Sequence, residues 1–199
     1  MADKKKLPST FFNMVVVLTV IAAISSLALG FTYSFTKDAI AQVGVKRTLK
    51  ALGEVLPEFN NNPNEEQYTI EGDPDITVYP AKKDGQTVGT AVKSYSDNGF
   101  NERIWIMMGF DAENKINGVS ILGHKETPGL GSKMAEPKFK NQFKGKDPSA
   151  FKLKVKKDGG DVDAISAATI SSRGFCDAAQ KAYNALTAER KEVKDESQK

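Results

Sequence analysis

The sequence predicts an α+β protein in which a single amino-terminal transmembrane helix precedes one domain with a mainly antiparallel sheet and flanking helices. Two observations carry this prediction. No charged residue lies between Lys6 and Lys37, a stretch longer than the roughly 20 apolar residues that cross a bilayer as a helix. Farther along, short β-branched or aromatic runs alternate with clusters of Gly, Asp and Asn, as in strands joined by turns, before a last helical pattern.

The composition fits one folded domain with an appendage. The chain has 199 residues, 40% of them hydrophobic and 27% charged, and domains cluster around about 100–150 residues. The net charge is only +3, with lysines scattered among acids, which gives no support to nucleic-acid binding. The chain has a single cysteine, Cys176, which excludes an internal disulfide. It also has a single histidine, His124, and so few cysteine and histidine ligands argue against a metal site. We therefore expect no bound metal.

The uncharged stretch is predicted to be a membrane anchor over residues 11–36, after a short tail of residues 1–10. A cleaved signal peptide is the main alternative, because small residues occur from Leu27 to Gly30. The apolar region of a signal peptide, however, normally has only about 7–15 residues. A buried core helix is a weaker alternative, since lysines flank a very long apolar run. We therefore expect a retained, single-pass helix.

The orientation of this anchor follows less directly from charge, because three lysines precede the span and basic residues also follow it. Asp38 offsets Lys37 at the far end, and large downstream domains translocate largely regardless of their charge. We predict a cytoplasmic amino terminus and an extracytoplasmic domain.

The domain is predicted to span residues 37–190 and to begin with a helix that leaves the membrane. Ile40, Val43, Leu52 and Val55 are roughly in helical register, and Pro57 ends the pattern. The NNNPNEEQ segment that follows is rich in turn formers and charge, which indicates a surface connection.

Strands and a final helix make up the rest of the predicted domain. The strands are expected at 76–81, 87–96, 103–111 and 116–124. An edge strand is expected at 151–156, where apolar residues alternate with lysines; a polyanion-binding stripe is the alternative reading of those lysines. An apolar stripe from Phe175 to Leu186 predicts the last helix, and residues 191–199 form a charged tail that we expect to fray.

The segment DAISAATISSRGF, which starts at Asp163, is rich in hydroxyls and precedes the last helix. Ser171 or Ser172 is predicted to cap this helix, because hydroxyl oxygens accept the unpaired amide hydrogens of a first turn. Alternatively, the small residues and amides let a phosphate approach the helix start, with Thr169 presenting its hydroxyl. The residue pattern alone leaves both interpretations open.

The segment GHKETPGLGSK, from Gly123 to Lys133, predicts a shaped loop after a strand. Pro128 fixes its own torsion, while two glycines allow conformations or close approaches denied to other residues. Leu130 lies between those glycines, an unusual place for a large apolar side chain. It either plugs the core of the domain or covers a flat apolar ligand.

Together, HKETPGLGSK and DAISAATIS resemble the flavin-binding domain shared by the G subunit of the Rnf ion-translocating electron-transport complex and the C subunit of the sodium-translocating NADH:quinone oxidoreductase. The family's attachment motif is Asp, two residues, Ser or Thr, Gly, Ala, Thr, and the last threonine carries flavin mononucleotide (FMN) as a phosphoester. Asp163, Ser166, Ala168 and Thr169 match it. Ala167 replaces the glycine, and its methyl group could hinder a close approach or a positive torsion.

The resemblance implies a covalent FMN on Thr169, supported by Asp163, Ser166 and Ala168. Leu130 is expected against the flavin ring, and Thr127 is expected to supply a polar contact. Lys133 near the phosphate is an alternative to an ordinary solvated lysine. No side chain of this chain is expected to act as a catalytic acid or base. The residues expected to line the flavin are Glu126, Thr127, Gly129, Leu130 and Gly131.

The resemblance also implies a function: a redox subunit of a multi-subunit translocase, without turnover of its own. The complex would couple ferredoxin:NAD electron transfer to ion translocation, with other membrane redox subunits as partners. A separate flavin transferase would attach the FMN, on the periplasmic side of a bacterial inner membrane. The alternative functions are the C subunit of a sodium-translocating NADH:quinone oxidoreductase and a membrane-anchored, flavin-containing regulatory domain.

Overall fold

The structure, a computed structural model, describes residues 10–196. Of the two predicted tails, residues 1–9 and residues 197–199 lie outside this described part. The chain divides into two units, residues 1–46 and residues 47–199.

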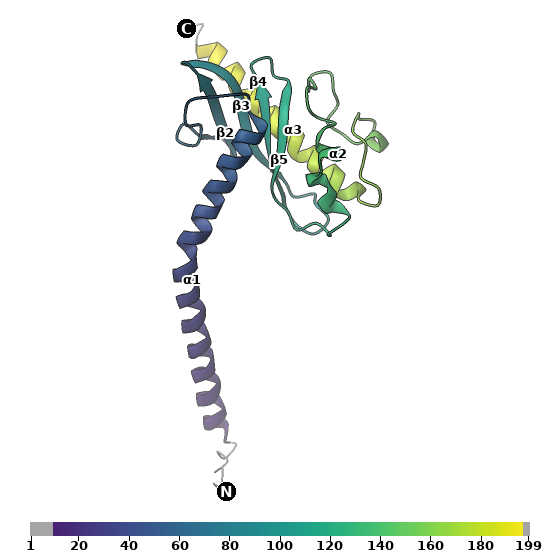
Figure 1. Cartoon of the computed structure of the whole chain (residues 1–199). Coiled ribbons are helices and arrows are strands. Elements are labelled where there is room, and N and C mark those ends of the chain that lie inside the picture. The colour runs from purple at the N-terminus through teal and green to yellow at the C-terminus, as the bar shows by residue number, and fades with distance from the viewer. Residues whose placement is uncertain (1–9, 197–199) are drawn as a thin grey trace. The chain divides into compact units, whose positions relative to one another are not determined.

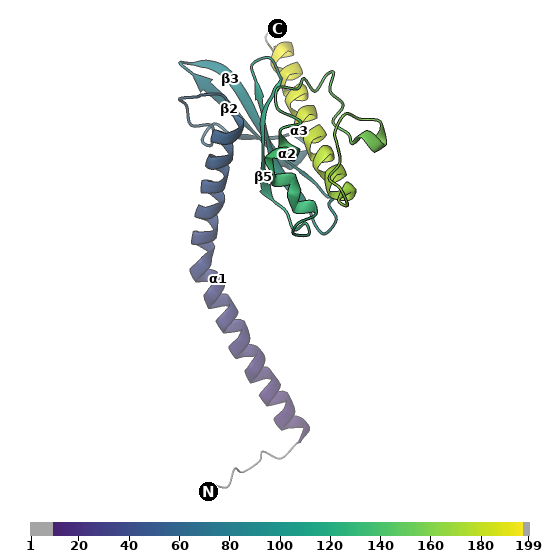
Figure 2. The same cartoon turned by 45° about the vertical axis from the view of Figure 1, so that its right-hand side comes forward.

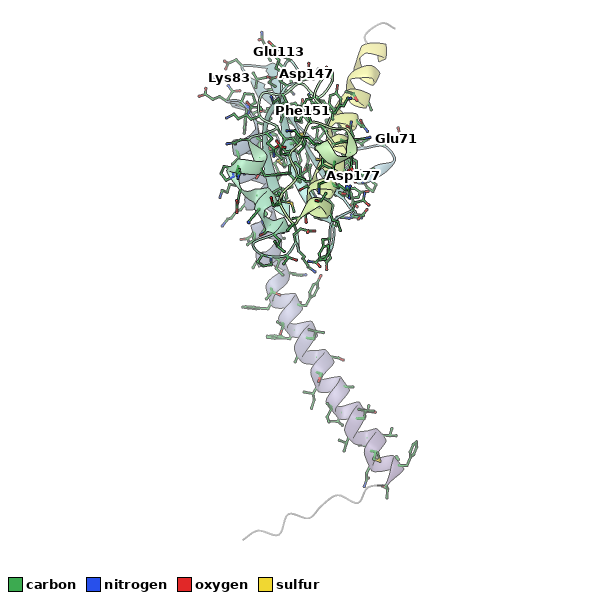
Figure 3. The ribbon with its side chains drawn as sticks, turned by 90° about the vertical axis from the view of Figure 1, so that its right-hand side faces the viewer. Glu71, Lys83, Glu113, Asp147, Phe151 and Asp177 are labelled. Carbon is green, nitrogen blue, oxygen red and sulfur yellow. The ribbon has the colours of Figure 1, made fainter. Side chains whose placement is uncertain are left out.

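The first unit consists largely of the amino-terminal part of helix α1 (Phe11–Val55). This part contains an 18-residue window with a mean hydropathy of 2.5, none of which is buried, and its side chains project outward along the helix (Figure 3). Thr19, Thr32 and Thr36 each donate a hydroxyl hydrogen to the carbonyl four residues earlier, which satisfies these donors without water. By length and composition, α1 can cross a membrane, and the helix predicted to follow the span is continuous with it.

The second unit is built on a five-stranded antiparallel sheet in the order β1-β2-β3-β4-β5 (Figure 1). Strands β2 to β5 confirm the four predicted strands. Strand β1 was not predicted, because three residues are too few to show a period of two. Asp84 and Asn114 adopt positive φ in two of the connecting turns, where Asp and Asn are tolerated better than most residues. The strands are β1 (Tyr68–Ile70), β2 (Asp73–Lys83), β3 (Gln86–Ser96), β4 (Ile104–Asp111) and β5 (Ile116–Gly123).

Helices cover both faces of the sheet, and Figures 1 and 2 show the sheet between α3 (Thr169–Glu196) and the carboxy-terminal end of α1. On the α3 face, the main core includes Val92, Ile106 and Phe175. On the other face, the last turns of α1, which belong to the second unit, bury Leu52 and Val55 in a smaller cluster with side chains of β2, β3 and β4. The predicted last helix is confirmed, but it continues to Glu196, so residues 191–196 of the predicted tail are helical.

Polar bonds join these layers at defined points. The Ser94 hydroxyl of β3 donates to the Ala178 carbonyl of α3 (2.7 Å), and the Ser96 hydroxyl donates to the carboxylate of Asp177 (2.7 Å), which is labelled in Figure 3. On the opposite face, Asn117 of β5 donates to the Val55 carbonyl (2.8 Å). Both helices are therefore held in one register against the sheet.

Between β5 and α3 the chain forms only short elements: η1 (Gly131–Ala135), α2 (Pro137–Lys140) and η2 (Lys156–Asp158). The edge strand predicted at 151–156 is wrong. Leu153 and Val155 are buried and the alternating lysines are exposed, but only one isolated bridge forms, between Val155 and Val162. The cause is a reversal at η2, where Gly160 packs directly on the Lys154 carbonyl and the backbone bonds stay within the loop.

Candidate functional site

A cavity of about 330 Å³ lies where three segments of the domain meet: the loop after β3, the loop after β5 and the start of α3. Thr169, the first residue of α3, forms part of its wall. Each segment also contributes a large apolar side chain to the wall, namely Phe100 (61% exposed), Leu130 (41%) and Ile170 (47%). Cofactor sites typically enclose about 300–1,000 Å³, so the volume of this cavity lies at the lower end of that range.

The structure brings most of the predicted site residues together. Those in the cavity wall are Glu126, Thr127, Leu130, Gly131, Ala168 and Thr169.

The remaining predicted residues lie elsewhere. Gly129 is in the same loop but is not part of the wall; it adopts a φ of +74°. Asp163 and Ser166 line a separate cavity of about 450 Å³, together with Lys133. Asp163 forms an ion pair with Lys156 (2.8 Å). The motif that starts at Asp163 is therefore divided between two neighbouring cavities.

Some wall residues were not predicted. Phe100 belongs to the DNGFNER connection between two strands, and an exposed phenylalanine within a turn-rich segment is the one signal that could have pointed to it. Ile170 and Ser171 follow the attachment motif directly and also line the wall, as does Ala167 within the motif.

The structure excludes one of the two roles that the sequence left open for Leu130. Its side chain is exposed and faces the cavity instead of entering either core cluster. The loop that presents it is held by its own bonds: the Thr127 carbonyl accepts the N–H of Leu130 (3.1 Å), and the Ser132 hydroxyl accepts the N–H of Gly129 (2.9 Å). Leu130 is thus not a core plug.

Glu126 is the polar centre of the wall, and its side chain is almost completely buried (4% exposed). One carboxylate oxygen accepts the backbone N–H of Phe100 (2.7 Å), and the other accepts the hydroxyl of Ser171 (2.5 Å). The N–H of Glu126 itself donates to Nδ1 of His124 (3.1 Å). A single carboxylate therefore joins all three segments that form the cavity.

Two glycines make room for this carboxylate. A Cβ on Gly131 would lie 2.6 Å from one oxygen of Glu126 and 2.4 Å from the Ser171 hydroxyl, and a Cβ on Gly99 would lie 2.8 Å from the other oxygen. Real Cβ atoms do not approach neighbours so closely. The second glycine of PGLG is therefore required for packing, whereas the first supplies the positive torsion.

The prediction that Ser171 or Ser172 caps α3 is wrong. The helix begins at Thr169, so both serines lie inside its first turn. The Ser171 hydroxyl donates to Glu126, while the Ser172 hydroxyl accepts the N–H of Ile165 (2.9 Å) and donates to the Ala168 carbonyl (3.0 Å). These hydroxyls bind the loops around the helix start instead of capping its amides.

Ala167, which stands at the glycine position of the attachment motif, adopts a φ of +60°. This left-handed conformation costs a residue with a Cβ about 1–2 kcal/mol. The structure therefore gives a physical reason for a glycine at this position.

We expect Ala167→Gly to raise the free energy of unfolding by roughly 0.5–1 kcal/mol, because relief of the torsion exceeds the entropy that a glycine adds to the unfolded chain. Thermal melts of the detergent-solubilised chain would measure this. Ala164→Gly is the matched control, since Ala164 has no positive φ, and it should lower stability. Equal destabilisation by both variants would contradict the torsional explanation.

Cys176 lies outside this cavity, on the buried side of α3. Burial, assisted by the nearby negative charge of Asp158, raises the pKa of its thiol to about 12. The thiol is therefore protonated at physiological pH and is a poor nucleophile.

Known proteins resemble this chain over most of its length. Residues 99–184, which include the three segments around the cavity, match the FMN-binding domain family. The G subunit of the ion-translocating oxidoreductase complex from Vibrio cholerae serotype O1 is 32% identical over 179 residues, covering 83% of this chain and 85% of that protein. The chain belongs to this family of G subunits.

Other family members and solved structures are similar. The G subunit of the same complex from Methanosarcina acetivorans is 31% identical over 193 residues, covering 95% of this chain and 99% of that protein. The crystal structure of Shewanella oneidensis NqrC is 25% identical, covers 64% of this chain and 71% of that chain, and has a TM-score of 0.44.

Proposed function

We propose that this protein is a membrane-anchored electron-transfer subunit that carries FMN as a phosphoester on Thr169. It acts in an Rnf-type complex that couples ferredoxin:NAD electron transfer to ion translocation. The observation that carries the proposal is the position of Thr169, in the wall of a partly open cavity within a domain of the FMN-binding family. The name that the Vibrio and Methanosarcina relatives share supports the choice of complex.

The cavity wall fits a flavin in several respects. Phe100, Leu130 and Ile170 offer apolar surface to a flat aromatic ring, and such surface is typical of cofactor sites. Ala167 and Ala168 are small, so they leave space for a phosphate beside Thr169. The amides at the start of α3 favour a negatively charged group there through their unpaired hydrogens and the helix dipole.

Bound FMN supplies a ring that accepts electrons and passes them on. Thr169 serves as an attachment point, and no proton transfer is assigned to it. A covalent bond keeps the cofactor at high effective concentration beside the wall whatever its intrinsic affinity. This matters most for a cofactor that works outside the cytoplasm, where a dissociated flavin would be lost.

Attachment requires a separate flavin transferase. The Thr169 hydroxyl loses its proton to the solvent, and its oxygen forms a new bond to the flavin-side phosphorus of a flavin dinucleotide. The diphosphate bond breaks, and the nucleoside monophosphate leaves with the bonding electron pair. Other membrane redox subunits of the complex are the proposed electron donor and acceptor.

The direct test is expression of the full chain together with a flavin transferase, followed by a denaturing gel viewed under ultraviolet light. The band should fluoresce as flavin does, and the native protein should co-purify with other membrane redox subunits. A fluorescent chain that purifies without redox partners would favour an anchored regulatory domain. A band without fluorescence would contradict the covalent cofactor.

For the topology we propose a cytoplasmic amino terminus and a periplasmic domain, supported by the long apolar part of α1 and the lysines before it. A reporter that functions only outside the cytoplasm should be active when fused after Lys199. Fusion of a strictly cytoplasmic reporter at the same position is the paired control. Activity of the cytoplasmic reporter would reverse the topology.

A further inference from the structure

We infer that Glu126 lowers the reduction potential of the bound flavin, by placing a buried negative charge in the cavity wall where the reduced flavin also becomes negative. This inference rests on the proposed FMN site and assigns to Glu126 a role beyond lining it. Glu126 is a tuning residue in this account: it changes the energy of the bound cofactor without exchanging atoms with it.

The contacts of Glu126 suit an ionised carboxylate. Each of its two carboxylate oxygens accepts one hydrogen bond, from the Phe100 N–H and from the Ser171 hydroxyl. An ionised carboxylate is purely an acceptor, so it suits two donors that approach different oxygens. Both donors are neutral groups, and therefore they stabilise the carboxylate without cancelling its charge.

The charged groups nearby leave this charge without a counterion. Lys125, the adjacent residue, forms an exposed ion pair with Glu102 of the facing loop (2.6 Å). His124 accepts the Glu126 N–H through Nδ1, so this ring nitrogen is unprotonated in the observed arrangement. Among the described residues with placed side chains, Glu126 makes no salt bridge within 4.0 Å.

The sign of the effect follows from Coulomb's law. Reduction of a flavin by two electrons with uptake of one proton leaves a negative charge on the ring. A nearby carboxylate in a poorly solvated wall raises the energy of that reduced form more than the energy of the neutral oxidised ring. The oxidised form is thus favoured and the potential falls.

The packing shows that the carboxylate is held in place. A Cβ on Gly131 would collide with the Ser171 hydroxyl and with one Glu126 oxygen, and a Cβ on Gly99 would collide with the Glu102 carbonyl oxygen and, less closely, with the other Glu126 oxygen. The two positions belong to different loops, which both close on the same side chain. The two hydrogen bonds, from the Phe100 N–H and the Ser171 hydroxyl, hold the carboxylate in the cavity wall.

The experiment compares midpoint potentials of full-length, covalently flavinylated protein by spectroelectrochemistry. Glu126→Gln removes the charge and keeps the shape, and its amide can still bond Ser171, so the potential should shift to more positive values. Glu126→Asp keeps the charge, so its potential should lie at or below that of the wild type. Glu113→Gln, in the β4–β5 turn, is the matched control and should leave the potential unchanged.

Flavin attachment is verified first by fluorescence on a denaturing gel, which separates this test from the proposed function. Wild-type protein without flavin would contradict the proposed function itself. With flavin present, an unmoved or more negative potential in Glu126→Gln overturns the tuning role. A positive shift in both Glu126 variants assigns the effect to packing, and it overturns the role as well. If Glu126→Gln does not retain flavin, the Glu126→Asp variant decides the test. A positive shift of its potential overturns the tuning role, whereas an unmoved or lower potential supports that role.

Discussion

Thr169→Val is expected to abolish denaturation-resistant flavin fluorescence completely while the domain still folds. Valine keeps the size and the β-branching of threonine but lacks the oxygen that forms the phosphoester. Thr169 is the first residue of α3 and is only partly buried, so loss of its hydroxyl opens no cavity in the core. In-gel fluorescence and peptide mass spectrometry after co-expression with a flavin transferase would measure the loss, and circular dichroism would verify the fold.

Thr187→Val is the matched control, because Thr187 is a second threonine of α3, remote from the cavity, whose hydroxyl donates to the Tyr183 carbonyl (3.1 Å). It should retain full modification. Ser166→Ala should lower the yield without moving the attached mass, since Ser166 belongs to the adjoining cavity. A flavin-phosphate mass on Ser166, Ser171 or Ser172 would falsify the assignment to Thr169.

The hydrogen bonds favour Thr169 over the neighbouring serines. Ser171 is 3% exposed and Ser172 is fully buried, and both hydroxyls already bond to Glu126 or to the loop before the helix. A phosphate on either would break those bonds, and a phosphate on Ser172 would also have to enter the core. Without the attachment motif, the residue pattern could not separate these hydroxyls, because all of them precede or begin the same helical pattern.

The strands were predictable wherever alternation and turn residues agreed, as in β2 to β5. The same alternation failed at residues 151–156, since a loop that folds back over a core also buries every second side chain. An alternation of apolar and polar residues indicates which side chains are buried. It does not indicate whether the backbone has a neighbouring strand to pair with.

The candidate site was predictable only in part. The attachment motif and the PGLG loop indicated Thr169 and Leu130, and the unusual alanine at position 167 indicated a torsion that the structure confirms. The bonds of Glu126 to Phe100 and to Ser171 join residues 26 and 45 positions apart. Contacts between residues so far apart in the sequence depend on the fold, and no local sequence pattern predicts them.

The end of α1 packs against glycines of the sheet. Gly109 of β4 pairs with Gly118 of β5, and the chain at Val55 packs directly above them. A Cβ on Gly109 would lie 2.1 Å from the Val55 carbonyl oxygen and 2.9 Å from the Val55 side chain. The same carbonyl accepts the hydrogen bond from Asn117, so a displaced helix end would lose that bond too.

We therefore expect Gly109→Ala to lower the free energy of unfolding by about 3 kcal/mol, at the upper end of the usual cost of overpacking. For a domain of this size the melting temperature should fall by roughly 6–12 °C, measured by circular dichroism on the detergent-solubilised full chain. Gly123→Ala is the matched control, because a Cβ there meets only Trp105 at 3.9 Å, and it should leave stability unchanged or slightly raised. If Gly109→Ala has the same melting temperature as the wild type, the packing of the end of α1 does not depend on this close approach to the sheet.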